Sequence, residues 1–196
     1  MKQIKQWAVL IMLTAITAMA TQAQTVDMSN YIVFTTKPGK TVSAEVVGQG
    51  WIKITNGSGN DRTIKLPSGH TKIASNAPNG AVTVYGKLDI VNCRETDLTG
   101  IDVTHNKSLR VLYCDNNELT QLDVSNMPEL IGLYCRDNKI HSLNAANSPK
   151  LEVIWAHNNS FTAQQIDVSV VNVGAGLVSA LTIADASNAK EVKNEK

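Results

Sequence analysis

Apolar residues recur through the middle of the chain with a fixed period of 21 residues. Each column of the repeat holds one apolar residue type or a close replacement of it. A fixed period in this range is the sequence signature of a solenoid, in which every repeat forms one coil. The columns are Leu88, Leu109, Leu130 and Leu151; Val91, Leu112, Leu133 and Ile154; Cys93, Cys114, Cys135 and Ala156; and Leu98, Leu119, Ile140 and Phe161.

The segment around Tyr113 indicates how one coil is built. Leu112 and Cys114 are apolar and flank Tyr113, which predicts a short strand with one buried face. Successive strands would stack in parallel and join their inward residues into one core. We expect the return half of each unit to be irregular or 3-10. It repeats as residues 98–104, 119–125 and 140–146.

A polar column follows each predicted strand and consists of Asn117, Asn138 and Asn159, with Thr96 in the first unit. The column lies where the strand turns away, so the amide can bond backbone groups that the turn leaves unpaired. Losing one such buried partner should cost on the order of 1–3 kcal/mol. With this column included, one unit reads L-x-x-L-x-C-x-x-N-x-L, which matches the leucine-rich repeat pattern.

The region before the repeats predicts a small antiparallel β domain. Short β-like runs alternate there with turn signals such as Pro38-Gly39 and Asn79-Gly80. This domain would cover the open first edge of the solenoid sheet. The predicted strands are residues 31–36, 42–47, 51–55, 62–66, 71–75 and 81–85.

The first 23 residues have the pattern of a secretory signal peptide. Lys2 and Lys5 precede a 14-residue apolar run, and small residues stand before a cleavage site after Ala23. The run is short for a membrane span, which needs about 20 residues, so an uncleaved anchor is the lesser alternative. We therefore expect a protein that is secreted, at the cell surface or periplasmic, with no transmembrane segment in the mature chain.

Together these patterns predict a β-rich solenoid of 21-residue leucine-rich repeats, preceded by an antiparallel β domain. The expected parts are a signal peptide (1–23), a β-rich N-terminal cap domain (24–86), the repeats (87–170) and a degenerate last strand with a C-terminal cap (171–196). Composition changes this picture little. The 43% apolar content excludes wholesale disorder. The 18 Lys and Arg residues nearly balance the 17 Asp and Glu residues, so the chain lacks the excess of positive charge that is typical of nucleic-acid-binding proteins.

The shared wording of the repeats, LTxLDVSxNxxLxxLxCxxN, resembles secreted bacterial leucine-rich repeat proteins of the internalin-like type. The resemblance covers residues 86–170, and in some of these proteins cysteine fills one core column as a ladder. The preceding β region also resembles the domain that precedes such repeats. This resemblance implies extracellular recognition, as in adhesion or binding of a molecule on a host or neighbouring cell, and it does not imply catalysis.

The outward positions of the predicted strands carry aromatic residues flanked by charge, a pattern that suits protein hot spots. Flat rings also suit stacking on a sugar, so a protein or a carbohydrate on a cell surface is the expected partner at this concave face. Alternatively, the stacked rings only stabilise neighbouring strands, by about 0.2–1 kcal/mol per pair. The candidate ligand-binding residues are Tyr113, Tyr134 and Trp155 in the middle column and Arg94, Asp115, Arg136 and His157 in the next.

The three cysteines share one column, so their side chains point the same way from strands about 4.8 Å apart. We expect a reduced, buried ladder, because free cysteine behaves as a small hydrophobe. The four histidines are scattered and no C-x-x-C occurs, so we expect no metal, cofactor or catalytic site. The sequence favours a non-enzymatic binding protein, with a structural or assembly component of the cell envelope as the alternative.

Overall fold

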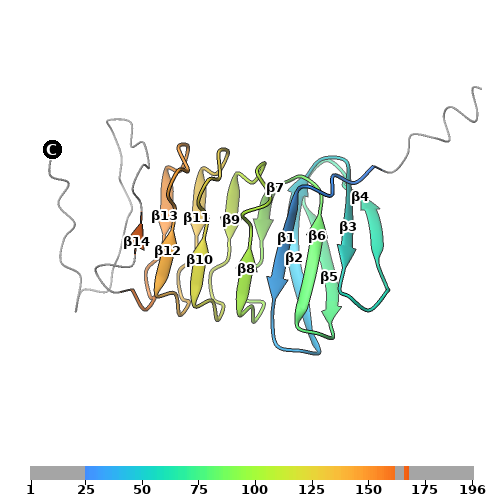
Figure 1. The fold of residues 1–196 in the computed structure, drawn as a ribbon, viewed down its shortest axis with the longest axis horizontal. Helices are drawn as coiled ribbons and strands as arrows, with labels where there is room; N and C mark the ends of the chain where they lie inside the picture. Colours follow the sequence, from blue (N-terminus) through green and yellow to red (C-terminus); the bar gives the residue numbers. More distant parts are fainter. Residues whose placement is uncertain (1–24, 162–165, 168–196) are drawn as a thin grey trace, which may run out of the picture.

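The computed structural model describes residues 25–161 and 166–167, and within them all regular secondary structure is β-strand. The molecule is a short stack of coils joined at one end to an antiparallel β domain (Figure 1). The predicted signal peptide (1–23) and the predicted C-terminal strand and cap (171–196) lie outside the described residues.

The N-terminal domain contains the antiparallel strands that the alternation of its sequence predicts. Tight turns separate them, and Gly80 shows why the turns need glycine: its φ is +79°, and a Cβ there would lie 2.8 Å from the Thr36 carbonyl oxygen. The strands are β1 (Tyr31–Thr35), β2 (Lys40–Gly48), β3 (Trp51–Thr55), β4 (Arg62–Lys65), β5 (Thr71–Ala77) and β6 (Ala81–Tyr85).

The 21-residue period is confirmed as a parallel stack of coils. In the sheet register, Val91 pairs with Leu112 and Leu133 pairs with Ile154, so every step along the stack is one repeat. The strands that carry these columns are β7 (Leu88–Asn92), β9 (Val111–Tyr113), β11 (Gly132–Tyr134) and β13 (Val153–Trp155).

The return half of each coil differs from the expectation of an irregular or 3-10 segment, because it also contains a short strand. Leu122 is buried between the exposed Gln121 and Asp123, and this alternation is that of a strand with one face in the core. The return strands are β8 (Gly100–Asp102), β10 (Gln121–Asp123), β12 (Ser142–Asn144) and β14 (Ile166–Asp167).

The N-terminal domain pairs with the first coil on both of its sides and so covers the first edge of the β7-β9-β11-β13 sheet, as predicted. On one side β2 pairs antiparallel with β7, giving a six-stranded sheet in the order β13-β11-β9-β7-β2-β5. On the other side β1 pairs antiparallel with β8 at the end of the order β4-β3-β6-β1-β8. One continuous apolar core runs through the domain and the coils.

The second side of the solenoid is interrupted between β8 and β10. These strands are neighbours in space, yet β8 belongs to the five-stranded sheet and β10 begins the three-stranded sheet β10-β12-β14 (Figure 1). The backbone NH of Thr99 instead donates to the Thr35 carbonyl oxygen of β1, at 2.9 Å. We call this interruption the seam.

The asparagine column forms the predicted buried ladder. Asn138 Nδ2 donates to the carbonyl oxygens of Cys114, Cys135 and Arg136 at 3.0–3.1 Å, and its Oδ1 accepts the Leu119 NH at 3.0 Å. One side chain thus ties two successive coils together. The residue before each ladder asparagine has a left-handed backbone, which Asn and Asp adopt most readily among the larger residues. These residues are Asn116, Asp137 and Asn158, with φ of 55°, 55° and 56°.

A second ladder, which sequence reasoning missed, lies on the opposite turn of the coils. The Ser148 hydroxyl is buried, donates to the Val124 carbonyl oxygen at 2.7 Å and accepts the Met127 NH at 3.1 Å. Asn106 holds the first turn in the same way through the carbonyl oxygen of Gly86 and the NH of Leu88. Asn106 and Ser148 thus occupy the same column of the repeat, and the apolar Met127 stands in this column between them.

Candidate functional site

The three predicted aromatic residues lie side by side on the outer face of the six-stranded sheet. Tyr113 ends β9, Tyr134 ends β11 and Trp155 ends β13, and the three occupy matching positions in the parallel register. The rings of Tyr113 and Tyr134 stack with centroids 4.6 Å apart and planes 24° apart. Trp155 meets Tyr134 edge-on, with centroids 5.4 Å apart. We call Tyr113, Tyr134 and Trp155 the ring strip.

Exposure differs along the ring strip. Both tyrosines are half-buried, whereas Trp155 is 40% exposed. Among the described residues, Met28 is the other large apolar side chain that is exposed. Trp155 is therefore the part of the ring strip that is most available to a partner.

Gly132 makes room for the stack. It stands two residues before Tyr134 on the same face of β11, and a Cβ there would lie 3.2 Å from Tyr134 Cε2. The phenol ring therefore leans back over the glycine, between the valines that border it on the neighbouring strands. Glycine is unfavourable inside a strand, so its presence here serves the placement of the ring.

The structure places Asp115 differently from the sequence prediction. We expected an exposed border residue, but Asp115 is fully buried. Its Oδ2 accepts a hydrogen bond from Arg94 Nε at 2.5 Å, and its Oδ1 accepts one from the Arg136 backbone NH at 3.1 Å. β9 ends at Tyr113, so strand alternation no longer sets the direction of the Asp115 side chain. This carboxylate holds the arginines and does not face a partner directly.

The two arginines lie against the ring strip. The Arg94 guanidinium carbon is 4.2 Å from the Tyr113 ring centroid, within the range of a cation–π contact. The Arg136 guanidinium carbon is 5.9 Å from the Trp155 ring centroid. Each side chain keeps more than a third of its surface in solvent. The structure thus brings five of the seven predicted residues together as one exposed surface.

His157 completes the predicted set at the last coil, where it is half-buried. Its backbone carbonyl oxygen accepts the Asp137 NH at 3.1 Å. Its contribution within the described residues is therefore to join coils through the backbone.

The cysteines lie beneath the ring strip and form the predicted ladder of free, buried thiols. Burial in the apolar core raises the pKa of Cys93 to about 12, and the nearby Asp115 carboxylate adds to this rise. Burial likewise raises the pKa of Cys114 and of Cys135 well above the ordinary range. Because thiolate is the reactive form, these side chains are inert core residues.

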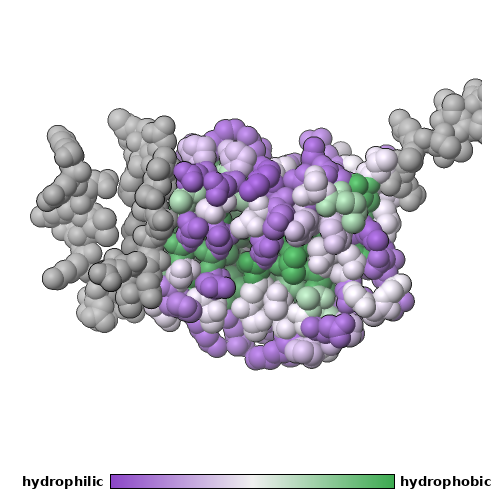
Figure 2. All heavy atoms as spheres, viewed as in Figure 1, coloured by the Kyte–Doolittle hydropathy of each residue, from purple (hydrophilic) through white to green (hydrophobic). Residues whose placement is uncertain are grey.

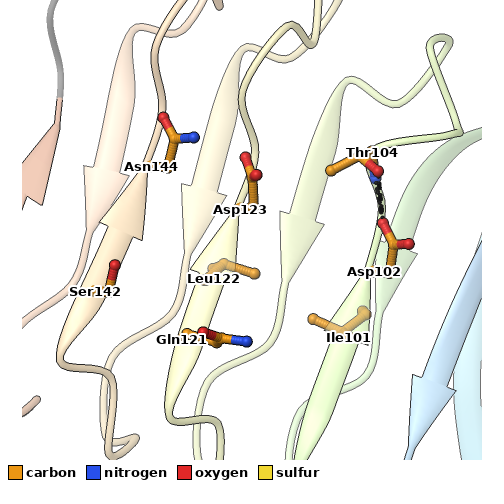
Figure 3. A pocket seen from close by; sticks show the side chains of 8 residues that line it. All are labelled: Ile101, Asp102, Thr104, Gln121, Leu122, Asp123, Ser142 and Asn144. Carbon is orange, nitrogen blue, oxygen red and sulfur yellow. Dashed lines mark hydrogen bonds between the residues drawn. The ribbon is translucent and has the colours of Figure 1, made fainter.

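A hollow on the opposite side of the solenoid was not predicted from the sequence. It has a volume of about 490 Å³, lies at the seam, and combines an apolar floor with polar side chains from three successive coils (Figure 3). The same side of the molecule shows a narrow apolar band between rows of polar residues (Figure 2). Its lining residues are Ile101, Asp102, Thr104, Gln121, Leu122, Asp123, Ser142 and Asn144.

The polar groups of this hollow are partly committed to local structure. Asp102 Oδ1 accepts the NH of Thr104 at 2.9 Å and its hydroxyl at 2.7 Å. Asp123 Oδ1 accepts the Ser125 NH at 2.8 Å. The D-x-T/S wording shared by residues 102–104 and 123–125 is the sequence signal that could have indicated these turns. The hollow is thus lined by turn-forming carboxylates.

Within residues 25–161 and 166–167, no group of three or more His, Cys, Asp and Glu side chains is placed to hold a metal ion. The same part of the chain has no helix of the length and apolar character needed to cross a membrane. Comparisons with protein-family models, with curated proteins and with solved structures gave no match.

Proposed function

We propose that this chain is a secreted, non-enzymatic binding protein that recognises a protein or a glycan through the ring strip and its two arginines. We also propose that it is related to the secreted bacterial leucine-rich repeat proteins of the internalin-like type. The observation that carries the functional proposal is the exposed indole of Trp155 at the end of the stacked tyrosines. Exposed Trp beside Tyr and Arg is the composition of interface hot spots.

The fold supports a binding role because the scaffold is rigid where the ring strip lies. The strands beneath it are fixed by the asparagine ladder and by a fully buried core. A preordered surface loses little side-chain entropy on association, which favours affinity. The stacked tyrosines are thus presented in one geometry.

Capture from cell-surface extracts tests this proposal. Wild-type protein should retain a partner that the Trp155→Ala variant does not retain, while both unfold at the same temperature. Met28→Ala is the matched control, because Met28 is also large, apolar and exposed but lies in the N-terminal domain. Protease or glycosidase treatment of the extract then assigns the class of the partner. Equal capture by wild type and Trp155→Ala would refute a role for the ring strip.

A structural or assembly role at the cell envelope is the second candidate. It is favoured by the exposed Trp155 at the end of the stack, because a second subunit that packs there would cover this apolar side chain. In that case the protein should self-associate as its concentration rises, which light scattering measures. A monomer at all concentrations, together with Trp155-dependent capture, would exclude this role.

A further inference from the structure

Arg136 lies within ion-pair distance of two carboxylates, but its Nε makes no hydrogen bond to either of them. This Nε is buried and has no hydrogen-bond acceptor in the described part of the chain. The nearest carboxylate oxygens, Asp115 Oδ1 and Asp137 Oδ2, lie 3.7 Å and 3.8 Å from Nε. Both distances exceed those of a hydrogen bond. Asp115 is already occupied by Arg94 Nε and by the Arg136 backbone NH. A ligand cannot reach the buried Nε, but the side chain as a whole is 38% exposed, so an incoming carboxylate can pair with the solvent-facing end of the guanidinium.

The ring faces next to Arg136 are mostly engaged. Tyr113 contacts the Arg94 guanidinium and stacks on Tyr134, so neighbouring side chains occupy the surfaces that a sugar ring would cover. Trp155 is the member of the ring strip that remains well exposed. A row of free ring faces for successive sugars is therefore lacking in this part of the chain. Ring edges, an indole and a guanidinium suit a polypeptide partner better.

The size of the surface limits the partner further. Successive strands lie about 4.8 Å apart, so the ring strip extends only about 10 Å from its first ring to its last. A strip of this length can contribute only a small part of the area that a standard interface between two folded proteins buries, which is about 800 Å² on each partner. A few residues of an extended peptide match it.

We propose that the ring strip binds a carboxylate-bearing peptide segment, an inference that rests on the proposed function. The peptide carboxylate pairs with the Arg136 guanidinium, and an adjoining apolar side chain packs on Trp155. Arg94 stays with Asp115 and supports the stack. The occupant is thus an exposed, extended acidic segment of a surface protein, for which a displayed peptide serves as the probe.

Selection of random peptides displayed on phage against the purified protein tests this inference. The selected peptides should be enriched in Asp and Glu, and their dissociation constants should rise about tenfold or more in Arg136→Gln, as expected for loss of a charge-assisted bond. Arg62→Gln is the matched control, because it removes the same charge from β4 in the N-terminal domain and should leave binding unchanged.

The outcomes separate this inference from the proposed function. Selected peptides that lack acidic residues, or that bind Arg136→Gln as tightly as wild type, would overturn the carboxylate assignment. If Trp155→Ala still abolished their binding, the ring strip would remain a binding site. Failure to select any peptide, or binding of an oligogalacturonide that Arg136→Gln weakens, would overturn the peptide class. If neither variant altered binding of any probe, both proposals would fail.

Discussion

Arg94 donates from its Nε to Oδ2 of Asp115, a fully buried carboxylate located one coil further along the solenoid. The pair links the first coil to the second beneath the ring strip. It also fixes the guanidinium against Tyr113, so a core carboxylate determines how an exposed cation is presented.

Asp115→Asn should loosen Arg94 while keeping the shape of the core. The amide cannot neutralise the guanidinium, so we expect the free energy of unfolding to fall by about 1–2 kcal/mol, at the lower end for a charged pair because Arg94 is partly exposed. Urea denaturation measures this change. Asp97→Asn, at an exposed carboxylate, is the control. Equal stability of the two variants would show that the buried pair contributes nothing.

Asn138→Ala should be more destabilising. The change leaves the Leu119 NH and the Arg136 carbonyl oxygen without their side-chain partner, whereas the carbonyl oxygens of Cys114 and Cys135 keep one asparagine donor each. We expect a loss of about 1–3 kcal/mol in the free energy of unfolding, which thermal denaturation measures. Asn60→Ala, in an exposed loop, should lose little. A small effect of Asn138→Ala would mean that water replaces the amide at no cost.

The cysteine ladder should be unreactive until the protein unfolds. Burial keeps Cys93 protonated, with a pKa raised from the ordinary 9.0 to about 12. Ellman's reagent at mildly alkaline pH should label none of the three thiols in the native state and all three in guanidinium chloride. Fewer than three thiols after unfolding, without reductant, would indicate a disulfide.

The same pKa rise fixes how stability depends on pH. The unfolded thiol loses its proton at a lower pH than the folded thiol, so the unfolded state gains from alkaline conditions first. The contribution of Cys93 is therefore complete below pH 9.0 and is lost as the pH rises from 9.0 toward about 12. Substitution of Cys93 by Ala should remove this part of the pH dependence.

Gly132→Ala should disturb the tyrosine stack more than the fold. The new Cβ would press on Tyr134, while alanine also stiffens the strand, so the free energy of unfolding should change by less than about 1 kcal/mol. The near-ultraviolet circular dichroism of the tyrosines should weaken. In Gly100→Ala, where the nearest atom is Thr35 Cβ at 3.4 Å, the spectrum should stay the same. An unchanged spectrum in Gly132→Ala would contradict the packing described for Tyr134.

The sequence predicted the repeat geometry well because the core columns obey one period. Leu112, Leu133 and Ile154 stand in register in the structure as they do in the sequence. Alternation also placed the ring strip correctly, since each ring belongs to a strand. It failed for Asp115 because that residue follows the strand, where a turn and two arginines decide the direction of the side chain.

The 21-residue repeat does not predict the seam, which is the break in strand pairing between β8 and β10. Residues 98–104 and 119–125 have nearly the same wording, yet β8 pairs with β1 while β10 pairs with β12. The difference depends on long-range competition: Gly100 stands where Gln121 stands one coil later, and its missing side chain leaves space beside Thr35. Periodicity carries no information about which neighbouring strand is chosen.

The seam also gives the molecule a mechanical asymmetry. One sheet is hydrogen-bonded without a break from β5 to β13, whereas the other is divided between β8 and β10. We expect the continuous sheet to resist a load applied across the two ends and the divided side to open first. We therefore expect bending of the stack to concentrate between β8 and β10, on the side away from the ring strip.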